Sequence, residues 1–178
     1  KSKPSKFAIW QQQLTEKALR LTGFEPNTAA EALIPKGMSR FYLDEAESLQ
    51  ACIPGAGGVF TARSLAKIYA ALANHGEIDG VRLLSEKTVG ELVKVHNRNR
   101  GDVVPMAMHW RLGYHRVFTT WPKTPYAFGH FGYGGSGAWA DPSRHLAVGY
   151  IVNTGSGSPF ADLRIWKINT AIIEAVGG

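Results

Sequence analysis

Residues 128–137 read Phe-Gly-His-Phe-Gly-Tyr-Gly-Gly-Ser-Gly, and residues 138–142 continue with Ala-Trp-Ala-Asp-Pro. Large side chains alternate through residues 126–130, which is typical of a strand. The glycine-rich run over residues 132–137 is a turn signal, and residues 138–140 form a second strand that ends at the Asp-Pro turn. Two strands joined by so short a turn predict an antiparallel hairpin.

Further periodic segments lie on both sides of this hairpin. Residues 146–152 form a nearly continuous apolar strand, and residues 106–117 alternate as another strand. Upstream, residues 61–76 form an amphipathic helix that begins after Thr61 and ends at a glycine, and residues 160–176 form a last helix. Helices come before and after three or four strands in the sequence, and short turns join the strands. This order predicts an α+β fold, an antiparallel sheet packed with helices.

The composition is that of a globular protein, with 178 residues, 44% hydrophobic and 19% charged. The net charge is +6, which would permit binding to nucleic acid or to an anionic membrane. The basic residues are scattered, however, and no stripe interleaves them with aromatic residues, so we expect no nucleic-acid partner. No apolar run reaches the ~18 residues of a membrane span.

The cysteine and the histidines do not indicate a metal site. Cys52 is the single cysteine, and its neighbours Ala51 and Ile53 favour a buried structural thiol. Among the six histidines, His109 and His115 are loosely paired, but on a strand they would lie about 20 Å apart. That separation is too large for one shared ion.

Two further stretches, which precede the hairpin in the sequence, contribute to a family resemblance. Residues 53–76 read Ile-Pro-Gly-Ala-Gly-Gly-Val-Phe-Thr-Ala-Arg-Ser-Leu-Ala-Lys-Ile-Tyr-Ala-Ala-Leu-Ala-Asn-His-Gly, and residues 79–85 read Asp-Gly-Val-Arg-Leu-Leu-Ser. With residues 128–142, they resemble the β-lactamase-related serine hydrolases, which include class C β-lactamases, penicillin-binding-protein-like D-Ala-D-Ala peptidases and β-lactamase-fold esterases. They are similar to the family's P-x-G-G-x-x-S/T-x-x-D-L-A-x-F helix, its G-x-L-D-G-x-R-L-L-S turn and its H-x-G-x-G-G-x-x-x-x-x-D-P strand.

The resemblance covers residues 53–176 well and residues 1–52 weakly. It implies the C-terminal part of a β-lactamase/transpeptidase-like fold. The activity it implies is hydrolysis of an ester or amide through an acyl-enzyme, without a metal or organic cofactor.

The resemblance also implies where the active site lies. His130, Phe131 and Gly132 stand where other members have Lys-Thr-Gly. His130 would line the site, where it could shuttle a proton or hold the carboxylate end of a substrate. The N–H of Tyr133 would form half of an oxyanion hole. The expected catalytic residues are therefore His130 and Tyr133, and the expected substrate-binding residues are Phe131, Gly132, Gly134 and Gly135. The alternatives are a flexible hairpin loop and a structural histidine.

The family's nucleophile motif is Ser-x-x-Lys at the start of a helix, with a Tyr-x-Asn or Ser-x-Asn loop. This chain contains Ser64-Leu65-Ala66-Lys67, but within the family's downstream helix, where the pattern is structural. Tyr42-Leu43-Asp44 does not match the loop motif. We therefore expect this chain alone to be inactive.

Three alternatives follow. The chain is the C-terminal part of a serine hydrolase, or a non-catalytic scaffold subunit that reuses the fold, or an unrelated protein. We expect residues 1–52 to form an irregular segment wrapping a missing or partner part, and residues 53–178 to form the C-terminal portion of the domain. The expected partners are the missing N-terminal half or a partner polypeptide, which would cover the open sheet edge, and a small ester or amide substrate if the assembly is active.

Overall fold

The computed structural model describes residues 17, 20–21, 28, 31–32, 42, 45–55, 57–101, 103–104, 106–121, 123–132, 134–155 and 163–177. They belong to two compact units, one of Lys1–Gly58 with Asn99–Ala107, and one of Val59–Arg98 with Met108–Gly178. In the described part of the chain, no helix is long and apolar enough to cross a membrane.

The first unit contains the helix α3, Ala46–Gln50, inside the segment that the sequence predicts to be irregular. None of the five helix residues is buried. Cys52 follows the helix and is exposed, so the prediction of a buried thiol is wrong. The apolar neighbours of the cysteine do not bury it, because Ala51 is exposed as well and Ile53 is only half-buried.

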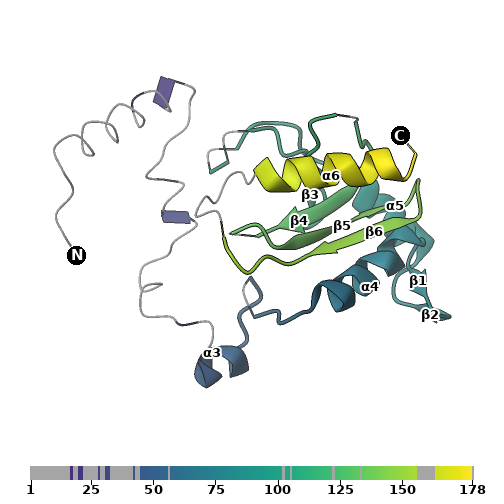
Figure 1. Ribbon diagram of the computed structural model, residues 1–178, viewed down its shortest axis with the longest axis horizontal. Coiled ribbons are helices and arrows are strands. Elements are labelled where there is room, and N and C mark those ends of the chain that lie inside the picture. The colour runs from purple at the N-terminus through teal and green to yellow at the C-terminus, as the bar shows by residue number, and fades with distance from the viewer. Residues whose placement is uncertain are drawn as a thin grey trace. The chain divides into compact units, whose positions relative to one another are not determined.

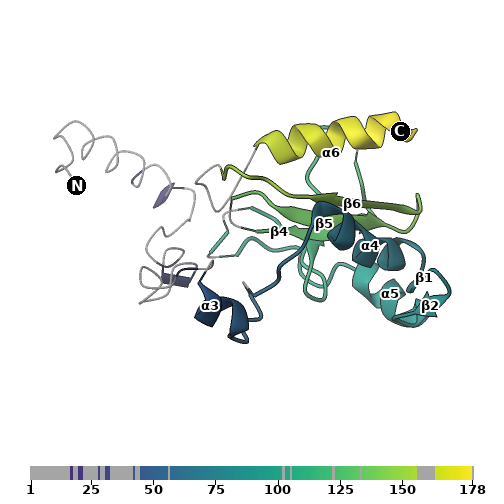
Figure 2. The ribbon, with the colours of Figure 1, turned by 60° about the horizontal axis from the view of Figure 1, so that its bottom comes forward.

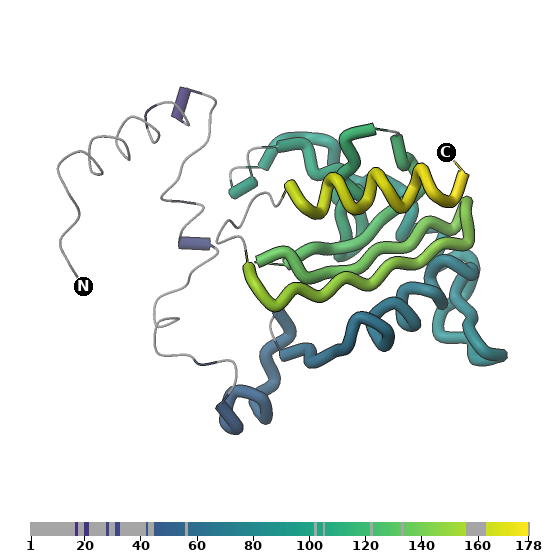
Figure 3. Tube along the Cα trace, in the orientation of Figure 1, coloured from purple at the N-terminus to yellow at the C-terminus, as the bar shows by residue number. Residues whose placement is uncertain are grey.

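The second unit is built on a four-stranded antiparallel sheet with the strand order β3-β4-β5-β6. The strands are β3, His115–Arg116; β4, Phe128–Phe131; β5, Gly137–Asp141; and β6, Leu146–Tyr150. The predicted hairpin is present, with His130 opposite Ala138 and Phe131 opposite Gly137. The antiparallel path of the strands can be followed along the Cα trace in Figure 3.

Two helices cover the two faces of this sheet (Figures 1 and 2). Helix α4, Ala62–Ala73, lies on one face with α5, Glu86–Val93, beside it, and α6, Leu163–Ala175, lies on the other. A small hairpin of β1, Glu77–Ile78, and β2, Val81–Arg82, connects α4 to α5. The predicted α+β arrangement of an antiparallel sheet packed with helices is confirmed.

The alternation of β5 explains why the sheet has a core on each face. Ala138 and Ala140 pack with Phe128 of β4 and Leu72 of α4 in one cluster. Trp139 points to the opposite face, where it packs with the buried Ile173 of α6. Successive side chains of a strand point to opposite faces, so a strand covered on both faces carries apolar side chains on both, as residues 138–140 do here.

The helix that covers the first face begins as the sequence predicts. Thr61 is its N-cap, and its side chain accepts a hydrogen bond from the N–H of Ser64 while the Ser64 side chain accepts one from the N–H of Thr61. This reciprocal pair satisfies two N–H groups that the first helical turn leaves without partners. After Ala73 the backbone of His75 and Gly76 turns to positive φ, which ends the helix.

The strand predicted over residues 106–117 is mostly absent. Only β3, His115–Arg116, forms, with isolated bridges at Ala107 and Trp110. The prediction is wrong because His109 and Gly113 have φ values of 50° and 79°, which lie in the left-handed region and bend the chain out of an extended path.

Candidate functional site

The predicted site residues lie at the end of β4 and in the turn that follows it. His130 and Phe131 are the last two residues of β4. Gly132 donates a hydrogen bond to the Ser136 carbonyl at 2.8 Å, and Gly135 donates one to the Gly132 carbonyl at 3.1 Å. These two bonds close the turn between β4 and β5. Tyr133, expected to supply an oxyanion-hole N–H, lies outside the described residues.

The glycines of this turn have different physical roles. Gly134 and Gly135 have φ values of 89° and 109°, which residues with a side chain rarely adopt. Gly132 is exposed, and a Cβ built on it would meet nothing closer than the Ser136 carbonyl oxygen at 3.7 Å. The space beside the Gly132 Cα is therefore open to the approach of another molecule, while the Gly132 N–H and carbonyl are bonded within the turn.

The turn is also tied to the end of the neighbouring strand. The hydroxyl of Ser136 accepts a hydrogen bond from the N–H of Val152, two residues beyond β6, at 3.1 Å. A side-chain bond of this kind holds a loop by satisfying a backbone group that has left the strand ladder. The turn is thus fixed at both its β4 and β6 sides.

The side chain of His130 is exposed and lies next to a second histidine, His115. Its ring centroid lies 5.2 Å from that of His115, and the rings meet edge to face at 62°. Although the His130 side chain is exposed, neighbouring protein atoms partly desolvate the ring and lower its pKa below the usual 6.5. The neutral imidazole is therefore the main form at pH 7.

The second histidine is almost fully buried and uses both ring nitrogens. His115 is 3% exposed. Its Nδ1 lies 2.8 Å from the Arg116 carbonyl oxygen, so Nδ1 donates the hydrogen bond. Its Nε2 accepts a hydrogen bond from the N–H of Phe131 at 3.3 Å. The sequence pattern relates His115 only to His109, as a distant pair, because nothing in the sequence places His115 beside β4.

The pKa of His115 is lowered to about 4. Burial is the main cause, because it penalises the charged imidazolium, and the positive charges of a protonated His130, Arg111 and Arg116 act in the same direction. The hydrogen bond to the Arg116 carbonyl opposes this shift only in part. His115 is accordingly neutral at pH 7, as its acceptor role at Nε2 requires.

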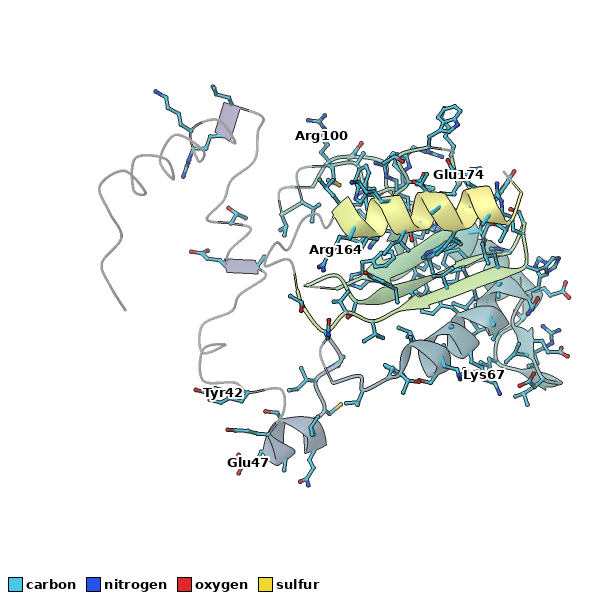
Figure 4. All side chains as sticks on the ribbon, in the orientation of Figure 1. Tyr42, Glu47, Lys67, Arg100, Arg164 and Glu174 are labelled. Carbon is cyan, nitrogen blue, oxygen red and sulfur yellow. The ribbon has the colours of Figure 1, made fainter. Side chains whose placement is uncertain are left out.

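The Ser64-x-x-Lys67 motif is used for other contacts. Besides the capping pair with Thr61, the Ser64 hydroxyl lies 3.0 Å from the Thr61 carbonyl oxygen. The Lys67 ammonium forms an ion pair with Asp79 at 2.6 Å, and both side chains are 64% exposed. Figure 4 shows Lys67 on the side of α4 that faces away from the sheet. These contacts are those of a helix N-terminus and a solvated helix face.

A shallow depression of about 220 Å³ lies elsewhere, lined by His75, Val93, Tyr126, Pro142 and Ser143. Pro142 and Ser143 belong to the turn between β5 and β6, at the opposite end of β5 from the Gly132–Ser136 turn. The depression contains none of the predicted site residues, so it is not part of the candidate site.

Comparisons with known proteins agree on one family for this chain. The Beta-lactamase family model matches residues 10–171. The chain is 44% identical over 116 residues to the esterase/beta-lactamase LipL of Mycobacterium tuberculosis, a match that covers 61% of this chain and 25% of LipL.

Two solved structures are similar in fold as well as in sequence. A penicillin-binding protein homolog from Caulobacter crescentus is 32% identical with a TM-score of 0.71, over 85% of this chain and 41% of that one. A family VIII carboxylesterase is 33% identical with a TM-score of 0.52, over 58% of this chain and 29% of that one. The chain therefore spans less than half the length of each of these relatives.

Proposed function

The chain belongs to the Beta-lactamase family, and from that membership we propose that it forms one wall of an acyl-transfer active site that hydrolyses an ester or amide through a serine acyl-enzyme. The observation that carries the proposal is the β4–β5 hairpin, where an exposed His130 and an open Gly132 backbone adjoin a turn of positive-φ glycines. Such a strand end lets a substrate approach the turn without obstruction by a Cβ.

In this proposal each predicted residue keeps a distinct role. The N–H of Tyr133 is half of the oxyanion hole, and Gly134 and Gly135 shape the turn between β4 and β5. Gly132 and Phe131 form the surface beside the acyl group. His130 contacts the reacting end of the substrate.

The protonation state of His130 favours one substrate class over another. Partial desolvation lowers its pKa, so at pH 7 it offers a neutral donor and acceptor instead of a fixed positive charge. A neutral imidazole can pass a proton to a leaving alcohol, whereas it attracts a substrate carboxylate only weakly. We therefore propose an ester without a carboxylate near His130, a substrate class included in the names of two relatives, the esterase/beta-lactamase LipL and the family VIII carboxylesterase.

The nucleophile, in our proposal, comes from residues outside this chain. Ser64 caps α4 through Thr61, and Lys67 pairs with Asp79, so the lysine amine does not activate the serine as a general base. The chain by itself is then inactive and requires the missing N-terminal half of the domain, or a partner polypeptide, to complete the site.

The test is labelling with a fluorescent fluorophosphonate and a fluorescent penicillin, followed by intact mass. We compare the chain alone with the protein expressed from its complete reading frame. The expected result is no label on the chain and one label on the complete protein, at a serine other than Ser64. The variant Ser64→Ala is the matched control and keeps full labelling.

Two outcomes would contradict the proposal. Turnover of p-nitrophenyl butyrate by the chain alone would show that it contains its own nucleophile. If the complete protein takes no label and binds polypeptides that also lack Ser-x-x-Lys, the fold serves as a non-catalytic scaffold subunit.

A further inference from the structure

The His115 side chain provides a hydrogen-bond acceptor that the backbone of a longer β3 would otherwise provide. The pairing of β3 with β4 ends at His115 opposite Gly129, so β3 has no residue to accept the N–H of Phe131. An unpaired N–H at a strand edge must find another acceptor or be exposed to water. The His115 ring supplies that acceptor from its Nε2 at 3.3 Å.

The ring is itself held in one orientation and one tautomer. Its Nδ1–H donates to the Arg116 carbonyl at 2.8 Å, which leaves Nε2 without a proton. Trp110 packs edge to face against the ring with centroids 5.8 Å apart, and Phe118 packs at 5.7 Å. A buried side chain with two bonded nitrogens and aromatic neighbours cannot rotate freely.

The group that this ring holds is the peptide between His130 and Phe131. On the other side, β4 pairs with β5 through His130 opposite Ala138 and Phe131 opposite Gly137. The peptide is therefore fixed from both sides, one residue before Gly132. His130 also contacts the same ring, with centroids 5.2 Å apart.

We infer that His115 is a positioning residue of the acyl-transfer site, which fixes the His130–Phe131 peptide through its Nε2 and so sets the direction of the Gly132 backbone that follows it. This inference rests on the proposed function, because it assigns His115 an effect on acylation through groups that would touch the substrate. His115 itself is buried and does not contact the substrate. Oxyanion-hole catalysis depends on donors held in place before the reaction, so loosening this peptide slows acylation without weakening substrate binding.

The first measurement is made on the unmodified complete protein by nitrogen-15 NMR. We expect a protonated Nδ1 and an unprotonated Nε2 on His115 at pH 7, and a coupling across the N–H···N bond between Nε2 and the Phe131 amide nitrogen. A His115 ring with its proton on Nε2 would overturn the inference.

Two variants then separate the hydrogen bond from simple packing. His115→Leu replaces the ring with an apolar side chain of similar size that has no hydrogen-bond acceptor. His115→Gln replaces it with a side chain whose amide oxygen can accept a hydrogen bond. We expect the Leu variant to exchange its Phe131 amide at least about fivefold faster, the effect of one ordinary hydrogen bond. Its kcat for ester hydrolysis should fall by at least the same factor at nearly constant KM, and the Gln variant should recover both.

The control is His96→Leu, which removes another histidine whose ring contacts a backbone carbonyl, in this case that of Glu91 in α5. It should leave the Phe131 amide and kcat unchanged. A folded Leu variant with unchanged exchange and unchanged kcat would refute the inference, and so would a Gln variant as impaired as the Leu variant. If the complete protein forms no acyl-enzyme at all, the proposed function fails, and the role of His115 in acylation fails with it. The tautomer and the exchange rate still show in that case whether His115 accepts the hydrogen bond of the Phe131 amide.

Discussion

Gly149 lies in β6 at the place where the strand passes closest to α4. A Cβ built on Gly149 would lie 2.3 Å from the Ala62 carbonyl oxygen, 2.8 Å from the Ala66 backbone nitrogen and 3.1 Å from the Ala66 Cβ. Carbon atoms without a bond between them approach at about 3.5 to 4.0 Å. Gly149→Ala therefore forces α4 and β6 apart by about 1 Å.

The expected cost is about 3 kcal/mol. Overpacking a buried contact costs about 1 to 3 kcal/mol, and this case lies at the upper end because two of the three atoms belong to the helix backbone and cannot rotate away. Replacing glycine lowers the entropy of the unfolded chain and returns about 0.4 to 1 kcal/mol. The net loss of about 2 to 3 kcal/mol corresponds to a melting temperature lowered by roughly 5 to 10 °C for a domain of this size.

Gly90 provides a matched control with the same chemical change. It lies inside α5, and a Cβ built on it would meet nothing within 4 Å. Gly90→Ala should therefore stabilise the protein by about 0.5 to 1 kcal/mol, because alanine favours a helix over glycine. The two variants should move the melting temperature in opposite directions.

The assay is urea unfolding followed by tryptophan fluorescence, with Trp139 as the buried reporter, combined with thermal melting. A Gly149→Ala variant as stable as the parent protein would refute the close approach of β6 to α4. A Gly90→Ala variant destabilised as strongly as Gly149→Ala would show that a general intolerance of alanine, and not the α4 contact, causes the effect.

Three further predictions concern buried polar groups and the candidate site. Asn169 accepts a hydrogen bond from the Trp139 indole at 2.9 Å and donates one to the Phe118 carbonyl at 3.0 Å, so Asn169→Leu should lower the free energy of unfolding by about 2 to 4 kcal/mol in urea titrations. Because burial lowers the pKa of His115 to about 4 from 6.5, the unfolded chain takes up a proton between these values and the folded chain does not. The stabilisation from a neutral His115 is complete above pH about 6.5, and about 3 kcal/mol is lost as the pH falls to about 4; His115→Gln should flatten that part of the stability curve. His130→Ala should slow labelling of the complete protein by at least tenfold, measured as a time course on gels, if His130 transfers a proton in acylation.

Local periodicity was sufficient to predict the central hairpin and the helices around it. The strands β4 and β5 overlap the predicted segments 126–130 and 138–140, with ends that differ by at most two residues, and α4 begins after Thr61 as predicted. These signals work because strand alternation, helix caps and glycine turns depend on neighbours within a few residues. The family resemblance relied on the same contiguous stretches.

The predictions that failed are those in which backbone or burial depended on distant residues. The alternation over residues 106–117 indicates a strand, but positive φ at His109 and Gly113 leaves only His115–Arg116 in the sheet. Cys52 has apolar neighbours in sequence, yet it is exposed. Hydrophobicity along the chain does not tell which segments another element will cover.

The sequence by itself therefore determined the fold class, the family, and the hairpin that carries His130 and the glycines, because each is encoded in short contiguous segments. Only the tertiary structure decided that Lys67, on α4, forms an ion pair with Asp79 in the hairpin that follows the helix. It also decided that His115 accepts the N–H of Phe131, sixteen residues away. That contact depends on the register of β3 against β4 and on the point where β3 ends, and hydrogen bonds between such distant groups form only when packing brings the strands together.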